Sequence, residues 1–148
     1  MLTQKMIATV EKQRLGFVAT ITPEGRPNVS PKGTFVVIND NTLAFGEIRS
    51  PNTLTNLLEN PAIEVNFVDP LARKGFRANG VARILTHASS AFDENIGRFN
   101  RWGDLAKRIR NIVIIDVEDV KPLTTPAYDD GATEEELRNN WAKILLTD

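Results

Sequence analysis

Basic and hydroxyl-bearing side chains flank a predicted helix start in the first third of the chain. Ser30 and Lys32 belong to one predicted strand, and Arg49 and Ser50 immediately precede Pro51. Serine followed by proline is typical of a helix start, because serine caps the first amides and proline suits the first helical position. The first amides of a helix lack intrahelical acceptors and carry the positive end of the helix dipole. These residues therefore outline an anion site.

A phosphate monoester, with about two negative charges, would suit such a site. The amides of Asn52 and Thr53 and the Thr53 hydroxyl would donate hydrogen bonds to it, since both residues fall in the first helical turn. Arg49 would add a bidentate contact and Lys32 a second positive charge. The same residues also fit an ordinary capped helix preceded by a solvent-exposed arginine. From these residues alone both interpretations stay open.

Other kinds of site have little support in the composition. The chain has no cysteine and one histidine, His87, which excludes disulfides, zinc-thiolate sites and multi-histidine metal sites. Ser30 and Ser50 have no evident base that would make either a nucleophile. We therefore identify no catalytic residue and predict no metal site. Trp102 fits two roles, packing and covering a planar ligand.

The overall composition describes a globular protein without a charge bias. Of 148 residues 41% are apolar and 25% charged, with 18 basic and 19 acidic side chains. This size fits one domain, residues 1–148. The balanced charge gives no reason to expect nucleic acid or a membrane as partner, and the basic run at residues 107–110 is interpreted as a solvated helix face. No stretch approaches the ~20 apolar residues of a membrane span, so we expect a cytoplasmic protein.

Hydrophobic patterns and turn residues predict six or seven strands with three or four helices. Strands are expected over residues 15–21, 27–32, 35–38, 42–45, 62–68, 75–85 and 111–117, and helices over 3–13, 50–60, 90–99 and 133–145. Pro31 indicates an edge strand and Gly80 a bulge or bend. Hairpin connections dominate, which favours a mainly β fold, an antiparallel barrel with peripheral helices, over a parallel sheet.

Three long segments together resemble a known family. They read LGFVATITPEGRPNVSPKG, FGEIRSPNTLTNLLENPAIEVNF and GFRANGVARI, and the tail TTPAYDDGATEEELRNNW is similar to that of short bacterial members. In order and separation they resemble the FMN-binding split-barrel proteins related to pyridoxamine 5'-phosphate oxidase. The resemblance implies a six- or seven-stranded split barrel that binds FMN non-covalently at a homodimer interface.

The resemblance also implies roles for particular residues. Asn52 and Thr53 match the helix start that binds the phosphate, where the oxidase itself is strongly basic, so Arg49 and Lys32 would supply the charge here. The terminal arginine motif of the oxidase is missing, and vitamin B6 phosphate oxidation is not expected. The positions implied to contact the cofactor are Ser30, Pro31, Lys32, Gly33, Glu47, Arg49, Ser50, Asn52 and Thr53, with Trp102 reaching it from the partner subunit.

Three functions remain open on this evidence. The first is an FMN-dependent oxidoreductase that transfers a hydride or electrons to an unknown small substrate or redox partner. The second is a non-catalytic FMN-binding protein for electron transfer, flavin storage or sensing. The third is a binder of haem or a deazaflavin. Haem has few possible ligands, since His87 is the single histidine and Tyr128 the single tyrosine.

Overall fold

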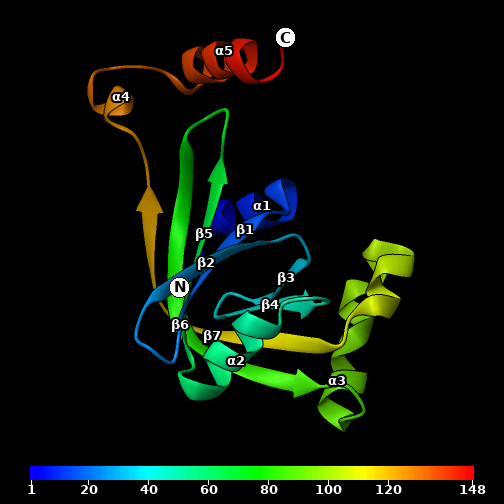
Figure 1. Cartoon of the computed structure of the whole chain (residues 1–148). Coiled ribbons are helices and arrows are strands. Elements are labelled where there is room, and N and C mark those ends of the chain that lie inside the picture. The colour runs from blue at the N-terminus through cyan, green and yellow to red at the C-terminus, as the bar shows by residue number, and fades with distance from the viewer.

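A seven-stranded sheet forms the body of the protein in the computed structural model, which describes all of residues 1–148 (Figure 1). Neighbouring strands are antiparallel, in the order β2-β1-β5-β6-β7-β4-β3. The edge strands β2 and β3 do not pair, so the sheet is open rather than a closed barrel. The predicted strand number and direction are confirmed. The strands are β1 Gly16–Ile21, β2 Pro27–Lys32, β3 Phe35–Asn39, β4 Thr42–Glu47, β5 Ala62–Asp69, β6 Lys74–Thr86 and β7 Asn111–Leu123.

Two strand residues explain local features of this sheet. Pro31 lies in β2, where one side of the strand has no neighbour, so its missing N–H costs no ladder hydrogen bond. The pairing of β6 with β7 shifts register between Asn79 and Gly80. A Cβ atom on Gly80 would lie 2.0 Å from the carbonyl oxygen of Asp116, so this close approach requires glycine. Both predictions, an edge strand and a bulge, are confirmed.

The helices begin at capping residues that the sequence identifies. The Thr3 hydroxyl accepts a hydrogen bond from the amide of Met6 at 3.2 Å, and Thr133 and Glu136 form a reciprocal capping box. The predicted helix over residues 90–99 is instead a short α-helix followed by 3-10 helical turns that extend to residue 108, with a kink at Gly103. No helix combines the length and the apolarity needed to cross a membrane. The helices are α1 Gln4–Gln13, α2 Pro51–Glu59, α3 Ser90–Asn95, η1 Ile96–Arg108, α4 Pro126–Asp129 and α5 Glu134–Leu145.

Strand β7 separates two hydrophobic clusters. Val113 and Ile115 face a larger cluster that also packs against α1, whereas Ile112 and Ile114 face a smaller one beneath α3 and η1. Alternate residues of a strand point to opposite faces, so a strand covered on both sides is apolar throughout. The buried run at the start of β7 follows from this. These buried residues hold the start of β7 against the end of β4, beside the candidate site.

The chain after β7 packs at one end of the molecule, away from the centre of the sheet (Figure 1). Strand β7 runs past the predicted end at residue 117 to Leu123, and α4 and α5 then lie beside the turn that joins β5 to β6. Leu137, Trp141, Ile144 and Leu145 have the spacing of an apolar face on α5, but only Leu137 is buried, and Ile144 and Leu145 are 63% and 49% exposed. Helical spacing therefore does not predict burial over the second half of α5.

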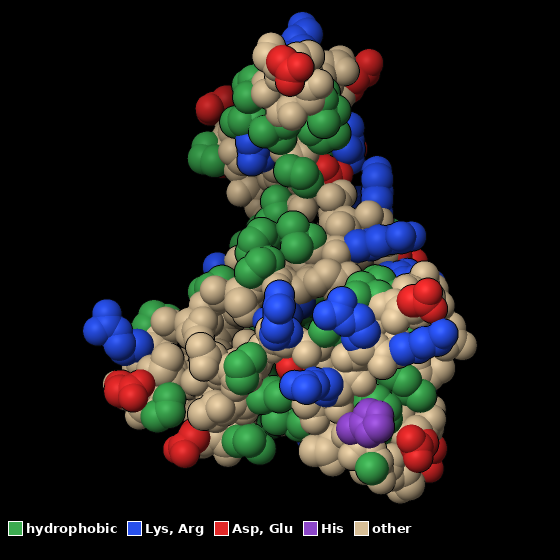
Figure 2. Space-filling view, turned by 45° about the vertical axis from the view of Figure 1, so that its right-hand side comes forward, with side chains coloured by type: hydrophobic (Ala, Val, Ile, Leu, Met, Phe, Trp, Pro, Cys, Tyr) green, Lys and Arg blue, Asp and Glu red, His purple; other side chains and the backbone are tan.

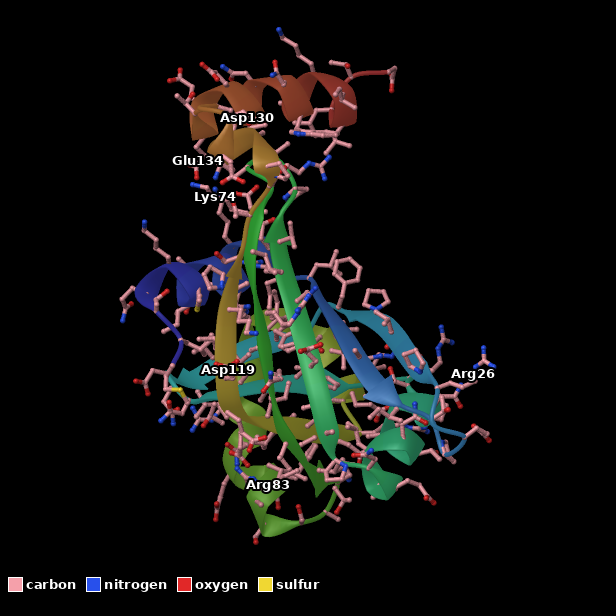
Figure 3. All side chains as sticks on the ribbon, turned by 90° about the vertical axis from the view of Figure 1, so that its left-hand side faces the viewer. Arg26, Lys74, Arg83, Asp119, Asp130 and Glu134 are labelled. Atoms are coloured by element: carbon pink, nitrogen blue, oxygen red, sulfur yellow. The ribbon has the colours of Figure 1, made fainter.

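Ion pairs and aromatic contacts attach α5 to this turn. Figure 3 shows Lys74 and Glu134 close together at this end of the molecule, and their charged atoms are 3.8 Å apart. Arg138 pairs with Asp69 at 2.7 Å and with Glu134 at 3.3 Å. The guanidinium of Arg73 lies 3.3 Å from the ring centroid of Trp141. We call this group of contacts the C-terminal clamp.

Candidate functional site

A buried carboxylate organises the loop between β4 and α2. Glu47 ends β4 with only 3% of its surface exposed. One carboxylate oxygen accepts a hydrogen bond from the amide of Ser50 at 2.8 Å, and the other accepts one from the Asn111 side chain at 2.9 Å. The register of the sheet places Glu47 opposite Asn111, so this contact follows from the pairing of β4 with β7. Glu47 thereby fixes the start of α2.

Lys32 reaches the same loop from the edge strand. Residues of β2 alternate between exposed and half-buried, which puts Ser30 and Lys32 on the inner face. The ammonium group of Lys32 donates a hydrogen bond to the Ser50 hydroxyl at 2.6 Å. The predicted cap is therefore wrong, because the Ser50 side chain makes no hydrogen bond to the first turn of α2. The hydroxyl expected to cap the helix instead accepts a hydrogen bond from Lys32.

The first turn of α2 consequently keeps donors without acceptors. The amides of Asn52 and Thr53 have no acceptor in the protein. Asn52 is exposed, whereas Thr53 is buried with its hydroxyl 3.5 Å from that of Ser30. Unpaired amides at a helix start attract anions, since their partial charges add to the helix dipole. This arrangement favours the anion interpretation over the ordinary cap.

A hollow of about 270 Å³, which we call the cradle, lies beside this helix start. Six of the ten predicted cofactor residues line it, from β2 and the residue after it, the β4–α2 loop and η1. Glu47 lies directly behind the loop, and Ser30, Asn52 and Thr53 sit at the adjoining helix start. The sequence did not identify Thr34, whose hydroxyl donates to the Gly46 carbonyl at 2.6 Å. The residues lining the cradle are Pro31, Lys32, Gly33, Thr34, Gly46, Ile48, Arg49, Ser50, Trp102 and Leu105.

Burial lowers the pKa of the Lys32 ammonium below its ordinary value, and the nearby Glu47 carboxylate only partly opposes this effect. The charged form of Lys32 is thus desolvated without a direct ionic partner, since its hydrogen bond goes to a neutral hydroxyl. An anion in the cradle would stabilise that charge and raise the pKa again. The electrostatics of Lys32 therefore favour a negatively charged ligand.

Trp102 lines the cradle from the same chain that supplies Lys32 and Arg49. It is half-buried, its ring centroid lies 5.8 Å from that of Phe99, and the Arg101 guanidinium lies 4.2 Å from it. Arg101 also donates to the carbonyl of Phe35 at 3.1 Å, which ties η1 to the edge strand β3. The ring is thus positioned at the rim of the cradle.

The model of the pyridoxamine 5'-phosphate oxidase family matches residues 2–121. The chain belongs to this family. The matched segment contains the whole cradle and stops two residues short of the end of β7, so α4 and α5 lie beyond the matched residues. None of the curated proteins compared with the chain matches it.

Solved structures with the same fold carry several different descriptions. HupZ of Group A Streptococcus is 29% identical with a TM-score of 0.71, over 84% of this chain and 96% of its own. An FMN-binding protein from Syntrophomonas wolfei subsp. wolfei is 14% identical with a TM-score of 0.68, over 82% and 86%. An F420 reductase is 20% identical with a TM-score of 0.63, over 81% and 98%. The last two likenesses concern the fold alone.

The two residues considered as haem ligands lie apart from the cradle. The Tyr128 hydroxyl donates to the carbonyl of Ala72 at 2.6 Å, beside the C-terminal clamp. His87 is exposed just after β6, with its ring 5.0 Å from that of Phe92. His87 thus lies at a strand end. Neither residue lines the cradle.

Proposed function

We propose that this member of the pyridoxamine 5'-phosphate oxidase family is an FMN-dependent oxidoreductase acting on a small substrate or redox partner. The observation that carries the proposal is the unpaired start of α2, where the amides of Asn52 and Thr53 have no protein acceptor beside a half-buried lysine. These groups suit a phosphate monoester, which FMN carries and riboflavin lacks. Membership of the family and a fold shared with an FMN-binding protein support the choice of a flavin.

Each part of the cradle has a task in holding FMN. The amides of the first turn of α2, with Lys32 and Arg49, bind the phosphate, because charge-assisted hydrogen bonds are the strongest of this kind. Glu47 positions these donors by fixing the amide of Ser50. The backbone of residues 30–33 would border the ribityl chain, and Trp102, which lines the cradle with residues 31–33, would cover the planar ring. When bound, FMN supplies hydride or electron transfer.

A second copy of the chain would complete the cradle. Small-molecule pockets usually enclose about 300–1,000 Å³, and the hollow in one chain measures about 270 Å³. The adjoining face of β1 and β2 is apolar and exposed, with Phe17 43% and Val29 61% accessible. Phe17 is paired with Pro31, which lines the cradle, so this face continues directly into the site. Exposed apolar patches of this kind mark interfaces, and we infer a homodimer.

Fluorescence titration of FMN and riboflavin into the purified protein tests the cofactor and its phosphate together. FMN should bind at least about tenfold more tightly than riboflavin, a difference of about 1.4 kcal/mol. Sedimentation of the protein with and without FMN tests the dimer. Equal affinities would remove the phosphate from the cradle, and a protein that quenches neither flavin would overturn the proposal.

A non-catalytic FMN-binding protein is the second candidate. Lys32 and Arg49 are the ionisable residues that line the cradle, and neither is arranged as a general acid or base. Stopped-flow mixing of the FMN-loaded protein with NADH and NADPH separates the two candidates. Reduction followed by turnover with an added acceptor supports the oxidoreductase, whereas a flavin reduced by neither donor favours the carrier.

A further inference from the structure

The basic run at residues 107–110 is not a continuous solvated helix face. Helix η1 ends at Arg108, and Ile109 that follows is buried with 3% exposure. Its side chain packs against Gly46, where a Cβ atom would lie only 2.5 Å away. Arg108 and Arg110 flank this anchor and are both exposed. Burial of Ile109 therefore fixes the backbone that carries the two arginines.

Backbone hydrogen bonds hold this segment against two other strand ends. The amide of Arg110 donates to the carbonyl of Glu47 at 2.8 Å, and the amide of His87 donates to the carbonyl of Arg110 at 3.1 Å. Asn111 is paired with Glu47 of β4 on one side and with Thr86 of β6 on the other. Three adjacent strand ends thus form one rigid floor.

A groove of about 820 Å³ lies over this floor. We call it the basic groove, because four of its nine lining residues are lysine or arginine, one is histidine and none is acidic. Figure 2 shows Lys and Arg side chains on the same face as the single histidine. The residues lining it are Ile48, Arg49, Thr86, His87, Lys107, Arg108, Ile109, Arg110 and Asn111.

The arginines of the basic groove have no partner within the chain. No carboxylate or carbonyl accepts a hydrogen bond from the side chains of Arg49, Arg108 or Arg110, and Lys107 pairs only with the exposed Asp104 at 3.0 Å. The chain as a whole carries a net charge of -1, so the cluster is not a consequence of a basic composition. Like charges repel when they are gathered at one place, and an anionic ligand removes that repulsion.

We propose that the basic groove binds the multiply charged anionic group, phosphate or carboxylate, of a small organic substrate. Planar guanidinium groups bind both kinds of oxyanion through paired hydrogen bonds. Arg49 and Ile48 line the groove and the cradle alike, so a molecule anchored in the groove lies beside the cradle. The role as substrate site rests on the proposed flavin function, whereas the anion site itself rests on the groove alone.

Calorimetric titration of pyrophosphate and of citrate into the FMN-loaded protein tests the proposal. At least one of the two should bind, and Arg108→Ala and Arg110→Ala should each weaken it by about 10- to 150-fold, the value of one lost charged hydrogen-bonding group. The control Arg26→Ala changes an exposed arginine in the turn between β1 and β2, and it should leave anion binding unchanged. All three variants should bind FMN as the parent does.

Two results would overturn the anion site: neither probe binds, or the groove variants bind the probes as the parent does. A probe that displaces FMN in direct competition would show that it occupies the cradle, which also overturns the groove as a separate site. If the protein fails to bind FMN but binds pyrophosphate through Arg108 and Arg110, the flavin proposal falls and the anion site stands.

Discussion

Positively charged side chains have carboxylate or aromatic partners in the C-terminal clamp, but not at the cradle. In the clamp, Arg138 meets two carboxylates and Arg73 lies over an aromatic ring. Beside the cradle, Arg49 has no partner, and Lys32 donates to a hydroxyl although a carboxylate is near. The unpaired cations at the cradle do not result from a shortage of carboxylates, since acidic residues outnumber basic ones by 19 to 18.

The fate of Glu47 shows how the difference arises. Its carboxylate accepts hydrogen bonds from the Ser50 amide and the Asn111 side chain, and makes no ion pair with Lys32. A carboxylate that is occupied in this way fixes the loop and leaves the lysine available to a ligand. Paired cations stabilise a fold, whereas cations kept unpaired at a rigid hollow are typical of a binding site. Four changes break or sharpen this contrast.

The largest effect is expected from Glu47→Ala. It leaves the amide of Ser50 and the Asn111 side chain, both half-buried, without acceptors, and each unsatisfied group costs about 1–3 kcal/mol. The free energy of unfolding, measured by urea denaturation, should fall by roughly 2–5 kcal/mol. Glu118→Ala changes an exposed residue of β7 and is the control. A loss below ~1 kcal/mol would mean that Glu47 does not organise the loop.

Lys32→Met should separate binding from stability. FMN affinity should fall by about 1.5–3 kcal/mol, because a charged hydrogen-bond donor to the phosphate is lost. The free energy of unfolding should stay the same or rise, since burial of the ammonium charge is unfavourable in the absence of a ligand. Fluorescence titration and urea denaturation measure the two quantities. Lys12→Met, on the exposed end of α1, should change neither.

Arg138→Met should give the opposite pattern in the clamp. It removes the partner of Asp69, whose side chain is 13% exposed, so the free energy of unfolding should fall by about 1.5–3 kcal/mol. FMN affinity should be unchanged, because the cradle has no residue in α5. Weaker FMN binding by this variant would contradict the separation of the two regions.

Acid should weaken the clamp by a smaller amount. Although burial raises the pKa of Asp69, hydrogen bonds from the amide of Ala72, the Arg138 side chain and the amide of Leu71 outweigh it and hold the pKa below its ordinary value of 3.8. A carboxylate with a lowered pKa stabilises the fold fully above its unfolded pKa and loses that contribution as the pH falls through the folded pKa. Thermal unfolding below pH 4 should show a smaller pH-dependent loss in Asp69→Asn than in the parent. Equal losses would contradict this assignment.

Much of the fold can be predicted from the sequence, because many of its elements are specified by residues that are close together in the chain. Strict alternation in β5, proline in the edge strand β2 and the capping box of α5 each specify one element without distant contacts. The missed features depend on tertiary structure. The Ser50 hydroxyl does not cap α2. It accepts a hydrogen bond from Lys32, which lies eighteen residues earlier in the edge strand β2.

The sequence predicts which residues belong to the candidate site, but not how they are arranged in space. Six of its ten members line one hollow, which the resemblance to the family anticipated. The basic groove was missed because its members come from three strand ends far apart in sequence, and the burial of Ile109 between two arginines has no periodic signature. Helical spacing also places Leu58 on one face with Leu54 and Leu57, yet Leu58 is 76% exposed, whereas Asn56 is buried and donates a hydrogen bond to the Thr20 hydroxyl at 3.0 Å.

Glu47 joins the two hollows through different atoms. Its carbonyl accepts the amide of Arg110 on the floor of the basic groove, and its carboxylate accepts the amide of Ser50 at the cradle. A displacement of Glu47 at one hollow would therefore also act on the other. Binding at two sites linked in this way is reciprocal: an anion that tightens the hold on FMN is itself held more tightly once FMN is present. Such linkage would make the affinity for FMN depend on whether the anion is bound.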